Sequence, residues 1–115
     1  MDRSAERVAR NDAIFREANE RISDTAEAEE VTEEIPFLCE CAEESCTEIV
    51  PLSQEEYESV RANATDFLNA IGHEVAAGPH GEVVERNHRY VVVRKRGAAA
   101  EIVDDLDPRA PIGKR

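Results

Sequence analysis

Residues 37–46 have the sequence Phe-Leu-Cys-Glu-Cys-Ala-Glu-Glu-Ser-Cys and contain all three cysteines of the chain. Pro36 precedes this stretch, and the residue before a proline avoids the helical region, so the backbone is expected to enter it in an extended conformation. In a strand, residues two apart point to the same face. Cys39 and Cys41 are therefore predicted to present both sulfurs on one side, with Glu40 pointing the other way.

The segment 42–45 is small and polar, which predicts a turn that brings Cys46 back beside the first two cysteines. Three thiols that converge in this way favour a metal site, because zinc binds four tetrahedral ligands that are mostly Cys and His. The chain has three histidines that could supply the fourth ligand: His73, His80 and His88. Two other interpretations are open, namely three buried cysteines in a reduced core and a redox-active thiol pair.

The composition limits the classes of function that the chain supports. With 115 residues, no Trp, three Phe and two Tyr, it has room for one domain with a modest core, which favours a stabilising metal or an oligomeric partner. The formal charge of −12 disfavours binding to nucleic acid. No apolar run approaches the ~20 residues of a membrane span. An odd number of cysteines fits a reducing cytosol, so a cytoplasmic location is expected.

Residues 3–30 are predicted to form one long helix. Val8, Phe15 and Ile22 recur every seven residues and give it a thin, heptad-like apolar stripe. Such a helix is marginal in water by itself, so the stripe is expected to pack against the rest of the domain, a second copy or another protein. We therefore expect a protein partner or self-association through this N-terminal helix, and no binding to nucleic acid or membrane.

The rest of the chain predicts a small α+β domain. A hairpin with the cysteine turn at its tip is expected from residues 37–41 and 47–52, and a second hairpin from 82–86 and 90–95. The Ser-Gln-Glu-Glu sequence at 53–56 has the capping-box pattern that starts a short helix. The predicted fold is thus a long N-terminal helix, a small antiparallel sheet with a cysteine-bearing hairpin turn, one short capped helix and a structural metal site.

Three segments are expected along the chain. Residues 1–34 are predicted to form the helix and an acidic linker, residues 35–103 the small α+β metal-binding domain, and residues 104–115 a mobile C-terminal tail. Residues 81–97 carry five basic residues within an acidic chain. They could meet the acidic half of a second copy or an acidic partner, but solvated outer positions of a strand pair are the favoured interpretation.

Several motifs occur together over roughly residues 35–95 and in the helix near residues 15–22. They are the Phe-Leu-Cys-Glu-Cys-x4-Cys element at 37–46, Gly72-His73-Glu74, and Val84-Glu85-Arg86 followed by the strand at 90–93. In these motifs the chain resembles a family of short uncharacterised bacterial proteins, mostly actinobacterial. The resemblance implies that His73 is the fourth ligand, and it implies no biochemical role. Ile71 stands where a proline is common in that family, so the approach to His73 could differ.

The predicted metal ligands are Cys39, Cys41, Cys46 and His73, and the predicted cofactor is a structural zinc. No His-Glu-x-x-His motif, phosphate-binding loop or nucleophile elbow accompanies them. The many glutamates are expected to be solvated and to form no acid–base pair, and those near the cysteines are expected to raise the pKa of the thiols.

The predicted function is a non-enzymatic, cytosolic, zinc-binding regulatory or interaction module. Two alternatives belong to other classes. The first is a thiol-based redox sensor that uses the three cysteines. The second is a metal-dependent enzyme in which one coordination position is open.

Overall fold

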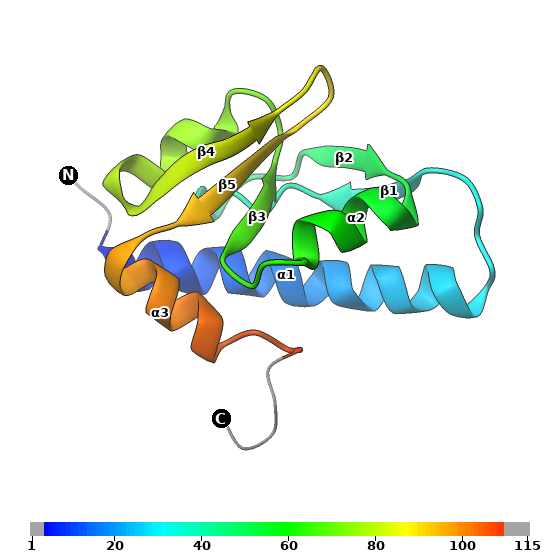
Figure 1. Cartoon of the computed structure of the whole chain (residues 1–115), viewed down its shortest axis with the longest axis horizontal. Coiled ribbons are helices and arrows are strands. Elements are labelled where there is room, and N and C mark those ends of the chain that lie inside the picture. The colour runs from blue at the N-terminus through cyan, green and yellow to red at the C-terminus, as the bar shows by residue number, and fades with distance from the viewer. Residues whose placement is uncertain (1–3, 110–115) are drawn as a thin grey trace.

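A helix of 24 residues, α1 (Ala5–Ala28), runs along one side of the molecule, and the other elements gather on it (Figure 1). The computed structural model describes residues 4–109. After α1 come β1 (Ile35–Leu38), β2 (Ile49–Leu52), α2 (Gln54–Arg61), β3 (Asp66–Asn69), the 3-10 helix η1 (His73–His80), β4 (Gly81–Arg86), β5 (Val91–Lys95) and α3 (Gly97–Asp105). None of the helices in this described range is long and apolar enough to cross a membrane.

The strands form two antiparallel sheets. β1 pairs with β2, and β5 lies between β3 and β4 in the second sheet. The α+β class and both hairpins are thus confirmed, with the strands divided between two small sheets. The cysteine turn connects β1 to β2, as the sequence predicts.

α1 begins and ends within two residues of the predicted helix. Ser4 is its N-cap, and the Ser4 hydroxyl accepts a hydrogen bond from the Arg7 N–H at 3.1 Å. At the other end Glu30 adopts a left-handed backbone with φ of 55°, and the Val31 N–H donates to the Ala26 carbonyl at 2.9 Å. This local closure stops the helix.

The buried face of α1 differs in chemistry from the predicted stripe. Val8 is buried as predicted, but Phe15 and Ile22 are only half-buried. Buried positions recur every three or four residues, and four of them are polar: Asp12, Arg16, Asn19 and Ser23. Since a buried polar group must be paired, the packing of α1 depends on partners from other elements.

Two buried ion pairs supply partners for Asp12 and Arg16. The Lys95 Nζ lies 2.6 Å from an Asp12 oxygen, and the Arg16 Nη2 lies 3.5 Å from a Glu40 oxygen, with all four side chains at most 1 % exposed. Both cations lie over the Phe67 ring. The Arg16 guanidinium carbon is 3.6 Å and the Lys95 Nζ 5.1 Å from the ring centroid. The prediction that the acidic residues are solvated is therefore wrong for Glu40, because its counter-charge comes from a distant part of the sequence.

Asp12 makes the stability of the protein depend on pH. Burial raises the pKa of Asp12 to about 7, against the opposing attraction of Lys95. An acid with a raised folded-state pKa binds more protons when folded, so its contribution to the free energy of unfolding falls as pH rises from about 4 to about 7. The Asp12→Asn variant should not show this decrease in the free energy of unfolding with rising pH. Its unfolding free energy should improve relative to wild type by up to about 1.4 kcal/mol per pH unit between about pH 5 and 7.

Urea unfolding of both proteins at several pH values measures this difference. The comparison at each pH removes the contribution of those groups that titrate alike in both proteins. A difference that stays constant with pH would show that Asp12 does not titrate in this range.

The main core lies between the first hairpin, α2 and the second sheet. The Phe37 and Tyr57 rings stack with centroids 4.2 Å apart. The predicted capping box is confirmed: the Ser53 hydroxyl accepts from the Glu56 N–H at 3.1 Å, and the Glu56 carboxylate accepts from the Ser53 N–H at 2.9 Å. The Tyr57 hydroxyl donates to Glu20 at 2.6 Å and joins α2 to α1.

The first part of the expected C-terminal tail is packed against the domain. α3 continues to Asp105, and Asp107, which is 6 % exposed, pairs with Arg61 at 2.5 Å. Arg109 contacts the carboxylates of Glu20 and Glu58. Positions 110–115 of that predicted tail lie outside the described residues.

Candidate metal centre

The Cys-x-Cys segment lies along the outer edge of β3. The Glu40 N–H donates to the Leu68 carbonyl at 2.7 Å, and the Ala70 N–H donates to the Cys39 sulfur at 3.2 Å. The Glu40 side chain accepts from the Leu68 N–H at 2.9 Å, so it reinforces the same edge. Cys39 and Cys41 are thus held in place by the backbone of the second sheet.

The turn after Cys41 brings the third sulfur to the first two. The Cys46 N–H donates to the Glu43 carbonyl at 3.0 Å, which closes the turn. Asn11 on α1 donates from its side chain to the Ala42 carbonyl at 3.0 Å and fixes the turn to the helix. All three cysteines are free thiols, with Cys39 and Cys41 buried and Cys46 half-buried.

His73, the first residue of η1, reaches the cluster directly after the short loop that follows β3. Gly72 has φ of 92°, a left-handed conformation that residues with a Cβ rarely adopt, and the His73 N–H then donates to the Ala70 carbonyl at 3.0 Å. The backbone turns tightly here and directs the imidazole Nδ1 to the three sulfurs. His80 and His88 are outside this cluster: the structure brings together Cys39, Cys41, Cys46 and His73.

The distances among these atoms fit a tetrahedral ion. The His73 Nδ1 lies 3.4 Å from the Cys46 sulfur, 3.6 Å from that of Cys39 and 3.8 Å from that of Cys41. With zinc–sulfur distances of about 2.3 Å, a zinc–nitrogen distance of about 2.0–2.1 Å and tetrahedral angles, each sulfur should lie about 3.6 Å from the nitrogen. All four ligand atoms lie within 4.8 Å of one another. These four residues could therefore hold a metal ion.

The thiols are not equivalent in their acidity. The hydrogen bond from the Cys39 thiol lowers the pKa of Cys41 to about 5, and the same bond, together with burial, raises the pKa of Cys39. Burial also raises the pKa of Cys46. The expectation that nearby glutamates raise the pKa of every thiol is thus wrong for Cys41. Contacts within the cluster and burial, rather than those glutamates, dominate all three values.

Arg16, Asn19 and Glu40 support the site, and sequence reasoning did not identify any of them as supporting residues. Asn19 donates to the Leu38 carbonyl at 2.8 Å and to Glu40 at 2.9 Å, and Arg16 donates to the Ala64 carbonyl at 2.8 Å and contacts Glu40. These bonds fix the segment that carries the first two cysteines. Two features of the sequence indicate these supporting residues. Polar residues recur at helical spacing in α1, and Glu40 stands between two cysteines whose side chains are predicted to point to the opposite face.

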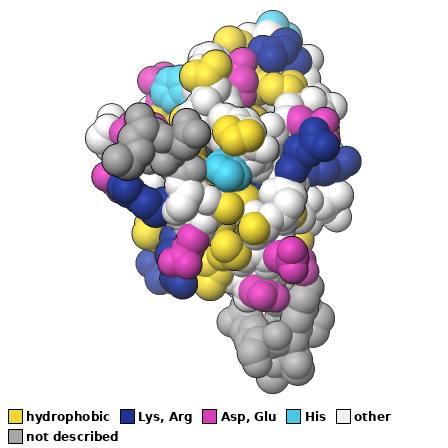
Figure 2. Space-filling view, turned by 90° about the vertical axis from the view of Figure 1, so that its left-hand side faces the viewer, with side chains coloured by type: hydrophobic (Ala, Val, Ile, Leu, Met, Phe, Trp, Pro, Cys, Tyr) yellow, Lys and Arg dark blue, Asp and Glu magenta, His cyan; other side chains and the backbone are white. Residues whose placement is uncertain are grey.

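The centre lies near the surface of the molecule. A hollow of about 260 Å³ adjoins it, lined by Cys41, Glu43, Gly72, His73, Val75 and Ala76. Figure 2 shows the end of the molecule where η1 lies, with hydrophobic side chains near the middle of the face, a histidine beside them and charged groups around. Solvent and small reagents can therefore approach the half-buried Cys46 and His73.

Comparisons with known proteins identify no relative: no family model, no curated protein and no solved structure matches the chain. The fold and the cluster define its class, a small α+β protein with a Cys3His group that could hold a metal ion. The resemblance to a family of short bacterial proteins stays a prediction.

Proposed function

We propose that the protein is a non-enzymatic, zinc-binding module of the cytoplasm that acts by binding another protein. The observation that carries the zinc assignment is the set of three sulfur–nitrogen distances, 3.4, 3.6 and 3.8 Å, around the His73 Nδ1. Three thiolates and one imidazole in a tetrahedral arrangement are the donor set that zinc prefers.

The zinc in this proposal is structural. Cys39, Cys41, Cys46 and His73 would complete a tetrahedral shell made of protein alone, as in structural sites, whereas catalytic sites keep a position for water or substrate. The four ligands come from two separate parts of the chain, the turn between β1 and β2 and the first residue of η1. A bound ion would tie the small hairpin to the second sheet and so add to the stability of a modest core.

The proposed role in protein binding rests on charge. A net charge of −12 repels nucleic acid and attracts basic protein segments. Free thiols in a cluster fit a reducing compartment. The buried face of α1 is already engaged by the domain, so a partner would contact the remaining surface of that helix and its neighbours.

Metal analysis tests the proposal. Protein purified without added metal should contain about one zinc per chain, and its thiols should titrate only after denaturation or chelation. A chelator should remove the zinc and lower the melting temperature, because binding is coupled to folding. A metal-free protein with three reactive thiols and an unchanged melting curve would refute the zinc assignment. Fast, reversible disulfide formation in such a protein would favour the redox sensor instead.

A further inference from the structure

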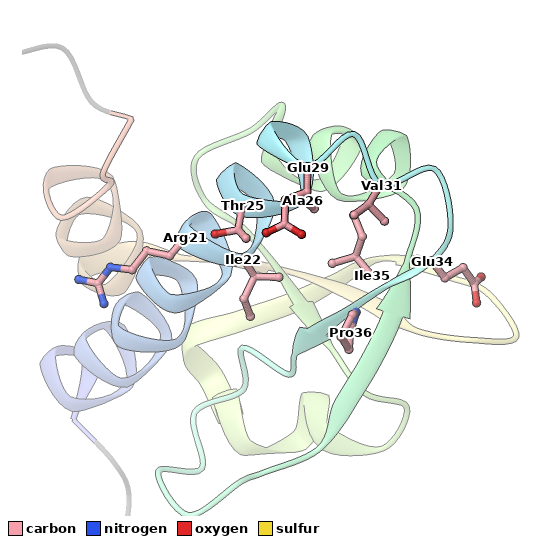
Figure 3. A pocket seen from close by; sticks show the side chains of 9 residues that line it. All are labelled: Arg21, Ile22, Thr25, Ala26, Glu29, Val31, Glu34, Ile35 and Pro36. Atoms are coloured by element: carbon pink, nitrogen blue, oxygen red, sulfur yellow. The ribbon is translucent and has the colours of Figure 1, made fainter.

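A groove lies between the last turns of α1 and the chain that enters β1 (Figure 3). Its volume is about 380 Å³, and it is lined by Arg21, Ile22, Thr25, Ala26, Glu29, Val31, Glu34, Ile35 and Pro36. The residues at the bottom of the groove are packed in the main core. Ala26 and Ile35 are at most 6 % exposed, and Ile22 packs against the same core. The groove is therefore a fixed feature of the fold.

The apolar surface continues from the groove over the outer face of the first hairpin. Pro36 lies opposite Pro51, and Leu38 lies opposite Ile49, so these four residues share one face. Ile49 is 45 % exposed, and Val31 on the groove wall is 40 % exposed. Contiguous exposed apolar surface of this kind is typical of interaction sites.

The backbone adds a hydrogen-bond acceptor at the same place. Neither Pro36 nor Pro51 has an N–H, so this pair exchanges no hydrogen bonds and the Pro36 carbonyl points away from β2. Leu38, two residues on, uses the same edge to bond Asn19 of α1. The Pro36 carbonyl therefore faces the side of the hairpin on which α1 and the groove lie.

Acidic residues outnumber basic ones around the groove. The segment that forms most of it, residues 22–36, contains six Asp and Glu and no Lys or Arg, and Arg21 lies at one end. Glu29 and Glu34 line the groove itself, and Figure 3 shows Glu34 and Arg21 extending outward at its opposite ends. Arg21 is paired with Glu17 at 2.8 Å. An occupant that combines apolar side chains with positive charge would complement this surface.

A second copy of the chain is a poor occupant. Its basic residues between 81 and 97 are already paired within the chain: Arg86 with Glu74, Arg89 with Glu34 and Glu56, Arg94 with Asp66, and Arg96 with Glu82. Lys95 is buried. The basic segment that the sequence offered for self-association is thus engaged in internal ion pairs.

We propose that the groove and the outer face of the hairpin bind a short amphipathic segment of a partner protein, with aliphatic residues on one face and Lys or Arg beside them. The aliphatic side chains enter between Ile22, Val31 and Ile35, and the basic groups reach Glu29 and the Pro36 carbonyl. This is the helix-in-groove mode of recognition. It deepens the proposed interaction role and does not depend on the metal.

A synthetic peptide tests the proposal. The probe is a fluorescein-labelled Leu/Lys peptide of about twelve residues with Leu at helical spacing, compared with a scrambled peptide of the same composition by fluorescence anisotropy. The amphipathic peptide should bind at least about tenfold more tightly than the scrambled one. Glu29→Lys should weaken binding about tenfold, whereas Glu27→Lys, the same charge change two residues away outside the groove, should have little effect.

A second pair of variants tests the apolar contact. Val31→Ser should weaken binding several-fold, whereas Val84→Ser, at a position on β4 with the same exposure, should not. Equal binding of both peptides, or equal effects of the two Lys variants, would overturn the proposal, since general attraction to an acidic protein explains either result. Zinc content is measured on the same samples. A protein that contains zinc but does not distinguish the two peptides would overturn the groove proposal and leave the zinc assignment intact.

Discussion

If the proposed zinc is bound, a Cys39→Ser variant is expected to lose it together with a large part of the stability. Cys39 is buried, its sulfur accepts a hydrogen bond from the Ala70 N–H, and it lies 3.6 Å from the His73 Nδ1. A serine hydroxyl is a poor zinc ligand at neutral pH, so the tetrahedral shell would be broken. Structural zinc contributes about 10–16 kcal/mol in small zinc-finger peptides, and a loss of even about 3 kcal/mol would lower the melting temperature by at least about 12 °C here.

Elemental analysis and thermal unfolding measure the two effects on the same preparation. Glu44→Gln is the matched control, because Glu44 is an exposed residue of the same turn and should change neither zinc content nor melting temperature. A Cys39→Ser protein that retains about one zinc per chain, or that lacks zinc but melts like wild type, would contradict the structural role of the metal.

The second large effect is expected for Glu40→Ala. The Glu40 carboxylate is fully buried and accepts hydrogen bonds from Asn19 and from the Leu68 N–H, both at 2.9 Å. Its removal leaves the buried Arg16 without its counter-charge and two donors without their acceptor. Breaking a buried pair in this way typically costs about 3–5 kcal/mol, which is a large fraction of the stability of a small domain.

Glu40→Ala should also weaken metal binding. Glu40 fixes the segment between two of the proposed ligands, and loss of such supporting contacts typically lowers metal affinity by about 10–100-fold. Urea unfolding and competition with a colorimetric zinc chelator measure the two quantities. Glu40→Gln retains the volume and one acceptor and should be intermediate. Glu48→Ala, at an exposed glutamate near the same cluster, is the control. Equal stability of Glu40→Ala and Glu48→Ala would show that the buried carboxylate contributes little.

Local sequence patterns predicted the helices and hairpins that are stabilised by interactions between residues close in sequence. The extent of α1, the capping box at Ser53 and Glu56, and the two hairpins follow from interactions between residues close in sequence. The convergence of the three cysteines was predictable for the same reason, because all three lie in the short connection between β1 and β2. His73 was indicated by the resemblance and by the preceding glycine, and the structure places it in the cluster.

The tertiary structure alone decided which charges are buried. Asp12 meets Lys95 and Arg16 meets Glu40 across separations that no periodicity along one helix reveals, and these pairs lie on the buried face of α1 beside the partly buried Phe15 and Ile22. It also decided that the C-terminal half of α1 forms a groove with β1. The physical reason is the same in both cases: the energy of a buried charge or of an open apolar surface depends on which distant residues surround it, and the fold determines those neighbours.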